Sequence, residues 1–271
     1  MDARINIVNK ERLNAGEARN IGMRAASGEF LMFLDADDFF EPELLHELLL
    51  SCLIYNADIC LCAGSNYNDA TGGFEGAPWL LREDLLPAKN PFSRKDCYER
   101  LFQIVSACAW TKMFRRSFIE KNGLRFQSMR TSNDMYFAHS ALAMAKRITS
   151  NTKKLINYRI NVPNSLQLSK SQSPLDFYKA LTALQTRLKD SGIYSELEQS
   201  FADLAFSNIM FNIRKQTTSE AADEIIDVFL REYITQYDIE GKAAECFTPE
   251  YYTQYEELLQ TMKKESGWSE S

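Results

Sequence analysis

The segment 28–38, GEFLMFLDADD, constrains the fold of this chain more than any other stretch. Its apolar run from Leu31 to Leu34 is too short for a helix and is bounded by a glycine and an acidic turn. The run therefore predicts a strand that is buried on both faces. Asp35, Asp37 and Asp38 follow directly. Because ligands bind at the carboxyl ends of strands in open α/β sheets, we expect these aspartates at the ligand-binding edge.

Three carboxylates this close together require a positive partner. Two of them about 4 Å apart repel by ~1 kcal/mol in water and by ~4 kcal/mol at the effective dielectric of a protein edge. A divalent cation that has oxygen ligands and carries substrate phosphates supplies that charge. The alternative is that Asp38 and its neighbours only turn the chain and favour the next helix, which begins near Pro42. One carboxylate would be enough for such a turn, so three favour the ligand site.

Composition narrows the class of protein. Lys and Arg number 31 against 37 Asp and Glu, a formal net charge of -6, which argues against a nucleic-acid binder because phosphate contacts need a basic face. The sequence has no signal segment and no apolar run near the ~20 residues that span a bilayer, so we expect a cytoplasmic protein. The six cysteines show no paired spacing, which argues against zinc, and Cys60 and Cys62 are expected in the core.

Hydrophobic periodicity predicts strands alternating with helices in the first 160 residues, and helices after that. The expected strands are 4–8, 31–34, 58–63, 107–115 and 155–160. The expected helices are 15–26, 42–55, 93–103, 117–122 and 133–145, followed by about four helices from residue 174 onward. The segment 65–91 is rich in Gly, Asn and Pro and predicts a long loop of the kind that borders a site.

Two charged residues on the expected helices are candidates for the site. Arg19 lies near the start of helix 15–26 and could reach a diphosphate beside the acidic edge, although alone it is better explained as a surface charge. Asp134 falls in the first turn of a helix capped by Ser132 or Asn133. The helix dipole stabilises a carboxylate there, which is a structural explanation, and it would also keep a general base ionised.

The order and spacing of several short motifs resembles the family 2 glycosyltransferases, which have the GT-A fold. The motifs are Ala18-Arg19-Asn20-Ile21-Gly22, Gly28-Glu29-Phe30, the segment 33–38, Trp110-Thr111-Lys112, the segment 133–137, and Tyr158-Arg159 with Ser165. The resemblance implies an α/β fold with a partial GT-A domain over residues 1–165, in which helices flank a mixed sheet. It also implies a helical C-terminal region over residues 166–271, similar in kind to extensions of bacterial polysaccharide-building members.

The resemblance implies a role for each matching residue. Asp35 and Asp37 match the D-x-D pair, the first near the nucleotide ribose and the metal shell, the second ligating the Mg²⁺ or Mn²⁺ that bridges the donor diphosphate. Arg19 matches the arginine that approaches this diphosphate. Asp134 matches the carboxylate that deprotonates the acceptor hydroxyl. Two further substrate-binding residues, Trp110 and Lys112, are expected toward the acceptor.

The chain departs from the family pattern in two places. Position 133 is Asn where the family usually has Glu. Family members also normally open with a strand, a helix and a second strand that together hold the base and ribose, and residue 1 falls after all of these. The resemblance therefore implies an N-terminally truncated transferase, whose affinity for a UDP-sugar is expected to be weak unless another chain supplies the missing strands.

The function that follows is metal-dependent, inverting transfer of a sugar from a nucleotide-diphosphate donor, expected to be a UDP-sugar, to a saccharide or lipid-linked acceptor. A lipid-linked acceptor would place the enzyme at the inner face of the membrane, in surface-polysaccharide assembly. A second hypothesis is a non-catalytic GT-A-like binding module. A third is a hydrolase that uses two carboxylates as acid and base, but clustered aspartates at a strand end suit a metal better.

Overall fold

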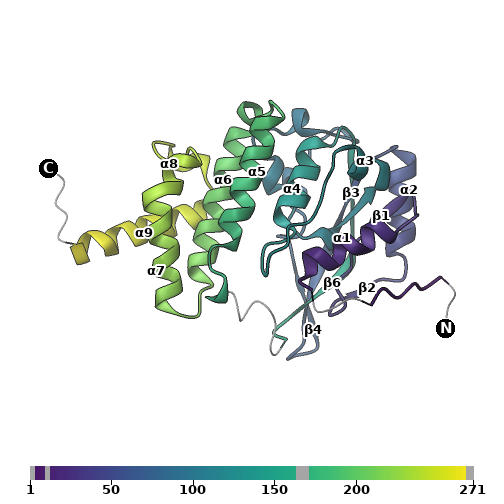
Figure 1. Ribbon diagram of the computed structural model, residues 1–271, viewed down its shortest axis with the longest axis horizontal. Helices are drawn as coiled ribbons and strands as arrows, with labels where there is room; N and C mark the ends of the chain where they lie inside the picture. The colour runs from purple at the N-terminus through teal and green to yellow at the C-terminus, as the bar shows by residue number, and fades with distance from the viewer. Residues whose placement is uncertain (1–3, 10–12, 163–170, 267–271) are drawn as a thin grey trace.

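The computed structural model describes residues 4–9, 13–162 and 171–266, and it shows a mixed sheet flanked by helices and followed by a helical region (Figure 1). Neighbouring strands follow the order β1 (Phe30–Met32), β5 (Lys112–Arg115), β3 (Ile59–Asn68), β6 (Ile148–Ile160) and β2 (Phe39–Phe40), and β4 (Gly73–Gly76) also pairs with β3. Only β3 and β6 among these pairs run parallel. The expected α/β class with a mixed sheet is therefore confirmed.

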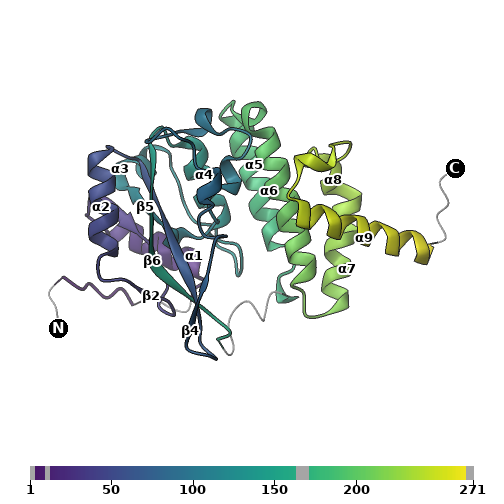
Figure 2. The ribbon, with the colours of Figure 1, turned by 180° about the vertical axis from the view of Figure 1, so that it is seen from behind.

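Helices cover both faces of the sheet. On one face α2 (Leu44–Ile54) packs against strand side chains that include Cys60, Cys62 and Met113. On the other face lie α1 (Ala15–Ala25), α3 (Arg116–Lys121) and α4 (Met135–Met144). Figure 2 shows α2 in front of the sheet and α1 behind it. Cys60 and Cys62 are fully buried and all six cysteines are free, as expected for thiols that serve as core residues.

The first strand is less enclosed than the sequence predicts. Leu31 and Phe33 are buried, but Met32 is only half-buried and Leu34 is 42% exposed. Within the described residues β1 pairs with β5 alone and so forms an edge of the sheet. The prediction that this strand is buried on both faces was therefore wrong. An apolar run is consistent with a central strand but does not specify a neighbouring strand on each side.

Only one of the two rows of apolar side chains on α2 is buried. Leu44, Leu48 and Cys52 are buried against the sheet, whereas the second row, Leu45, Leu49 and Leu53, is at least 40% exposed. A helix that is apolar around most of its surface normally has packing partners on more than one side. In this structure α2 meets the sheet with one row of side chains.

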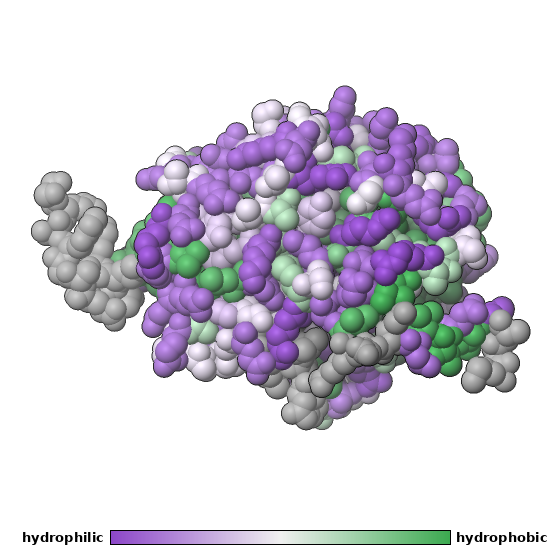
Figure 3. Space-filling model, viewed as in Figure 1, coloured by the Kyte–Doolittle hydropathy of each residue, from purple (hydrophilic) through white to green (hydrophobic). Residues whose placement is uncertain are grey.

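Several expected boundaries moved. The segment 4–8 forms no strand and its side chains are exposed, at the lower right of the space-filling view (Figure 3). The strand predicted over 58–63 continues to Asn68 and turns into β4, so the expected loop 65–91 begins with a β-hairpin. The strand predicted over 107–115 is a 3₁₀ turn, Ala109–Thr111, followed by β5. The last strand, β6, begins seven residues earlier than position 155.

The helical region packs directly on the sheet domain. Its helices are α5 (Asp176–Asp190), α6 (Tyr194–Arg214), α7 (Ser219–Val228), a π-helical turn (Phe229–Tyr233), α8 (Ile234–Gln236) and α9 (Pro249–Ser266). One continuous apolar cluster runs from the sheet through α4 to α5 and α6. The division at residues 165 and 166 stays a prediction because this boundary, like Ser165, lies outside the described residues.

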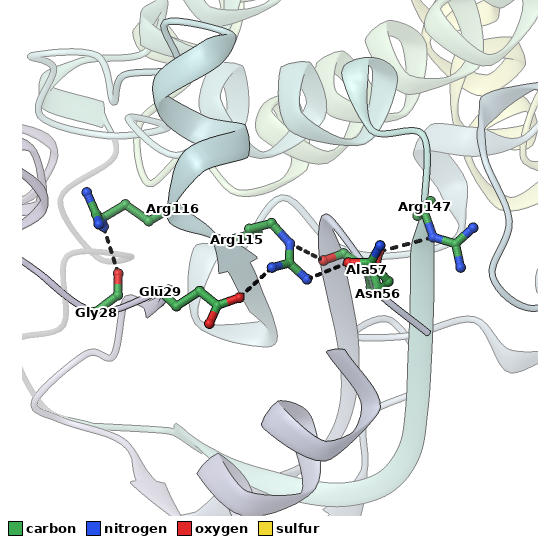
Figure 4. Close-up of polar contacts among 7 residues, drawn as sticks. All are labelled: Gly28, Glu29, Asn56, Ala57, Arg115, Arg116 and Arg147. Atoms are coloured by element: carbon green, nitrogen blue, oxygen red, sulfur yellow. Dashed lines mark hydrogen bonds and ion pairs between the residues drawn. The ribbon is translucent and has the colours of Figure 1, made fainter. Parts of the chain in front are cut away.

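Arginine side chains fasten the end of the sheet remote from the aspartates. Figure 4 shows Arg115, Arg116 and Arg147 bonding to oxygen atoms of residues 28–29 and 56–57. Arg115 pairs with Glu29 at 2.6 Å and bonds the carbonyl of Ala57 at 3.1 Å. Much of their donor capacity is used inside the fold, which indicates a structural role for this cluster.

The close seating of α1 gives a paired test of the fold. A Cβ at Gly16 would lie 2.1 Å from the backbone oxygen of Gln127, whereas a Cβ at Gly22 meets nothing within 4 Å. We expect Gly16→Ala to lower the free energy of unfolding by about 1–3 kcal/mol through overpacking. Gly22→Ala should raise it by up to about 1 kcal/mol because alanine favours helix. Urea unfolding of both variants tests this, and equal stabilities would contradict the described seating of α1.

Candidate active site

The three aspartates lie together on the segment that leads from β1 to β2. One carboxylate oxygen from each of Asp35, Asp37 and Asp38 lies within 4.8 Å of the others. The backbone N–H of Asp38 donates to the carbonyl of Asp35 at 3.4 Å, which closes the turn. The structure therefore brings the sequence-predicted carboxylates to one place at the edge of the sheet, which we call the acidic edge.

Little positive charge compensates the acidic edge. Arg19 pairs with Asp35 at 2.5 Å, and the backbone N–H of Arg159 donates to Asp38 at 3.0 Å. Among the described residues Asp37 makes no hydrogen bond or ion pair, and its side chain is exposed. Burial raises the pKa of Asp38 to about 6, opposed by the Arg159 hydrogen bond and reinforced by the charges of Asp37 and Asp35. The edge therefore carries excess negative charge.

This donor set fits a hard divalent cation. Carboxylate oxygens are the ligands that Mg²⁺ and Mn²⁺ prefer, and Mg²⁺ is usually held by one or two carboxylates together with substrate phosphates. Asp37 offers both of its oxygens, whereas Arg19 already occupies one oxygen of Asp35. The residues present are therefore suited to a cation that a phosphate ligand also contacts.

Helix α1 positions Arg19. The side chain of Asn14 caps this helix by accepting from the backbone N–H of Glu17 at 2.9 Å, as the sequence predicts. The buried amide of Asn20 donates to and accepts from the backbone of Phe126, at 2.9 Å in each direction. These contacts hold α1 in a position from which the guanidinium group of Arg19 reaches the acidic edge.

Arg19 also connects the acidic edge to the segment that carries Asp134. One of its nitrogens donates to Asp35 and another to the buried Asn133 at 2.8 Å. The guanidinium carbon lies 5.5 Å from the ring centroid of Phe126. The sequence predicts Asn133 only as a possible helix cap, and the resemblance marks it as a departure from the family pattern. Its position next to Asp134 was the available signal for this contact.

Asp134 lies directly before α4, which begins at Met135. Burial raises the pKa of its carboxyl, and the nearby charges of Arg19 and Lys112 oppose that rise. Desolvation is the largest influence on this pKa and opposes the helix dipole, and Asp134 makes no capping hydrogen bond. That the dipole tends to keep this carboxylate ionised therefore stays a prediction. A raised pKa brings a carboxylate closer to the range of an efficient general base.

Trp110 and Lys112 point into the protein interior. Lys112 is fully buried and donates to the carbonyls of Ser106 and Cys108 at 2.6 and 2.9 Å and to the Thr111 hydroxyl at 2.9 Å. Trp110 is 3% exposed, on the α2 side of the sheet, and stacks on Tyr158. Their expected contacts with an acceptor stay predictions, and in this structure Lys112 holds the turn that precedes β5.

Two surface cavities lie away from the acidic edge. One, of about 420 Å³, is lined by residues of α1, α3 and the segment after α3. The other, of about 500 Å³, lies between α6 and the loop after α8. Neither contains Asp35, Asp37, Asp38 or Asp134, so the arrangement of charged groups, and not cavity size, marks this site.

Residues 1–123 match the family model described as glycosyl transferase family 2. Over these residues the chain is similar to the family 2 glycosyltransferases. A putative glycosyltransferase of Bacillus subtilis, EpsH, is 28% identical over 171 residues, which cover 62% of this chain and 48% of the relative. The poly(ribitol-phosphate) β-N-acetylglucosaminyltransferase TarS of Staphylococcus aureus is 22% identical over 189 residues, covering 69% of this chain and 30% of the relative. The chain thus spans about half or less of the length of these relatives.

Solved structures support the GT-A fold for this chain. The crystal structure of S. aureus TarS 1–349 with UDP-GlcNAc aligns with a TM-score of 0.56 at 16% identity, covering 92% of this chain and 72% of that one. The corresponding complex with UDP aligns with a TM-score of 0.54. At this identity the likeness shows the fold alone. Within the described residues, none of the helices is both long enough and apolar enough to cross a bilayer.

The burial of Lys112 predicts a pH dependence of stability. Burial lowers the pKa of Lys112 to about 8 in the folded chain, from an ordinary value near 10.5. Between these values the unfolded chain holds a proton that the folded chain has released, so stability rises with pH. Relative to Lys112→Met, we expect the wild type to gain up to about 3 kcal/mol of unfolding free energy between pH 8 and 10.5.

Urea unfolding at a series of pH values measures this difference. Lys121→Met on the exposed surface of α3 is the matched control, and its unfolding free energy should follow that of the wild type at every pH. A constant difference between the wild type and Lys112→Met would contradict the burial of this ammonium group.

Proposed function

We propose that this protein is a metal-dependent, inverting glycosyltransferase that moves a sugar from a UDP-sugar to a hydroxyl group of a saccharide or lipid-linked acceptor. The observation that carries the proposal is the chain of contacts from the acidic edge through Arg19 to the segment of Asp134. The match of residues 1–123 to the family model, and the structures of TarS with UDP and UDP-GlcNAc, support the choice of donor. With a lipid-linked acceptor the protein would act in the cytoplasm at the inner face of the membrane, in bacterial surface-polysaccharide assembly.

The donor diphosphate would be held between the acidic edge and α1. Asp35 and Asp37 supply carboxylate oxygens for Mg²⁺ or Mn²⁺, which when bound neutralises the negative charge that grows on the departing diphosphate. Arg19 uses two of its nitrogens inside the fold. A guanidinium group has five N–H donors, so Arg19 keeps capacity for a phosphate oxygen.

Asp134 would act on the acceptor. The acceptor oxygen forms a bond to the anomeric carbon while the bond from that carbon to the diphosphate oxygen breaks on the opposite face, which inverts the configuration. The acceptor's proton passes to the carboxylate of Asp134, and the nucleotide diphosphate leaves with the bonding electron pair. The raised pKa of Asp134 favours this proton transfer.

Two other functions predict different results. A GT-A-like binding module would bind UDP and Mn²⁺ without turning over any nucleotide sugar. A hydrolase would release free sugar from an oligosaccharide without a nucleotide. Three aspartates lie close together and one of them, Asp35, pairs with Arg19, which favours cation and phosphate binding over a single protonated acid.

The donor site can be tested by calorimetric titration. We expect UDP to bind weakly in the presence of Mn²⁺, through its diphosphate, because the strands that hold the base in the family pattern are missing. Inorganic pyrophosphate should bind at the same place because it makes the same contacts. Asp37→Asn should weaken both by about tenfold or more, since it removes a negative charge beside the cation. Asp223→Asn, on the exposed surface of α7, is the control and should bind as the wild type does. Equal binding by wild type and Asp37→Asn would refute the donor site.

The catalytic role of Asp134 is tested by turnover. In a screen that begins with UDP-glucose, UDP-galactose and their N-acetyl forms, Asp134→Asn should lower the turnover of an accepted donor by about 10²–10⁴-fold. Its binding of UDP with Mn²⁺ should stay within about twofold of the wild type, because Asp134 acts on the acceptor. UDP release at the wild-type rate by Asp134→Asn would exclude it as the base.

A further inference from the structure

Three aromatic rings lie beside the acidic edge and have no part in the proposed chemistry. Phe39 on β2, Tyr67 on β3 and Phe74 on β4 pack edge to face, with centroids 5.1 Å apart for Phe39 and Tyr67 and 5.2 Å for Tyr67 and Phe74. Phe39 directly follows Asp38, and Tyr67 is opposite Phe74 in the β3–β4 hairpin. We call these three residues the aromatic platform. The β3–β4 hairpin, which carries Tyr67 and Phe74, extends from the sheet next to β2 and β6 (Figure 1).

Arg159 of β6 ties the platform to the acidic edge. Its guanidinium carbon lies 5.1 Å from the ring centroid of Phe39 and 5.4 Å from that of Tyr67. Its backbone N–H donates to Asp38, and its side chain pairs with Asp69 at 2.6 Å. The charge of this arginine is therefore balanced locally, and the platform surface is close to neutral.

Hairpin stability explains only part of the platform. A cross-strand aromatic pair such as Tyr67 and Phe74 stabilises a hairpin modestly. Phe39 and Tyr67 are half-buried, but 62% of Phe74 is exposed to solvent. An aliphatic residue of ordinary strand propensity would cover Tyr67 equally well without presenting a phenyl ring. The three rings are in mutual contact and lie beside the charged pair of Arg159 and Asp69, and a contiguous exposed apolar patch with a polar rim marks an interaction site.

We propose that the aromatic platform is a subsite for a neutral pyranose ring of the acceptor. The C–H groups on one face of a pyranose are apolar and can lie flat on an exposed aromatic ring. Ionic groups of the ligand would gain little here, because Arg159 and Asp69 neutralise each other. Its assignment to the acceptor rests on the proposed function. Arg19 joins Asp35 to Asn133, the residue before Asp134, and the platform joins the same acidic edge at Asp38.

The same rings could stack a nucleobase, which would make the platform part of the donor site. The position of the platform distinguishes a sugar ligand from a nucleobase. Arg19, the arginine assigned to the diphosphate, bonds Asp35, whereas the platform is attached to the other end of the acidic edge through Asp38 and Arg159. The geometry therefore favours a sugar on the platform, and uridine serves as the competitor in the test.

Saturation-transfer NMR with three probes tests the subsite. We expect methyl β-D-glucopyranoside to receive magnetisation at its axial ring protons, whereas ribitol, which has no ring face, should receive little. Uridine at the same concentration should not displace the glucoside. A ribitol signal equal to that of the glucoside, or displacement of the glucoside by uridine, would overturn the proposal.

Variants assign the signal to the platform. Phe74→Ala should weaken glucoside binding by about fivefold or more, and Phe74→Tyr should keep it within about twofold, because stacked aromatic contacts contribute ~0.5–1.5 kcal/mol. Tyr98→Ala removes an aromatic side chain that is 49% exposed outside the platform and should bind as the wild type does. Unchanged binding by Phe74→Ala, with its fold verified by circular dichroism, would refute the subsite.

Failure of the subsite and failure of the proposed function are distinguishable. Loss of UDP and Mn²⁺ binding in the wild type, with glucoside binding intact, would leave the sugar platform and remove its assignment as an acceptor subsite. Normal UDP binding without any glucoside signal would leave the transferase and remove the platform from it.

Discussion

The ion pair between Arg19 and Asp35 is the interaction on which the arrangement of the candidate site depends. It joins α1 to the segment after β1, and the second bond of Arg19 to Asn133 extends the connection to the start of α4. The side chain of Arg19 is only 13% exposed, so the pair is poorly screened by solvent. One guanidinium group in this position cannot balance the charges of Asp35, Asp37 and Asp38 together. The remaining negative charge is what a divalent cation and its phosphates would satisfy.

The candidate site is assembled from distant parts of the chain that local packing holds in place. Gly16 allows α1 to approach the backbone at Gln127, and the amide of Asn20 clasps the backbone of Phe126. Buried Lys112 ties the turn before β5 through three hydrogen bonds. These contacts lie behind the acidic edge and fix the positions of the groups that face a substrate. Raised pKa values for Asp38 and Asp134 follow from the same burial.

The sequence predicted the features that local chemistry determines. The Asn14 cap of α1, the proximity of the three aspartates and the position of Asp134 at the beginning of a helix all follow from short-range patterns. Long-range pairing determines the rest. The apolar run 31–34 does not reveal that β1 has a single neighbour in the described sheet. The first half of β6 was missed because its pairing with β3 is irregular near the polar residues Lys153 and Lys154, which interrupt the apolar pattern. Trp110 lies in a 3₁₀ turn and Lys112 follows that turn, and both side chains are buried, which spacing alone does not encode.

The central claim is that the acidic edge grips a cation and, through it, a nucleotide diphosphate. The most direct measurement is an anomalous difference map from crystals of the protein soaked with Mn²⁺ and UDP. The account predicts one strong peak about 2.1 Å from a carboxylate oxygen of Asp37, with diphosphate oxygens completing its coordination and the guanidinium of Arg19 facing the phosphates. A manganese peak elsewhere, or UDP bound away from Asp35 and Asp37, would contradict it.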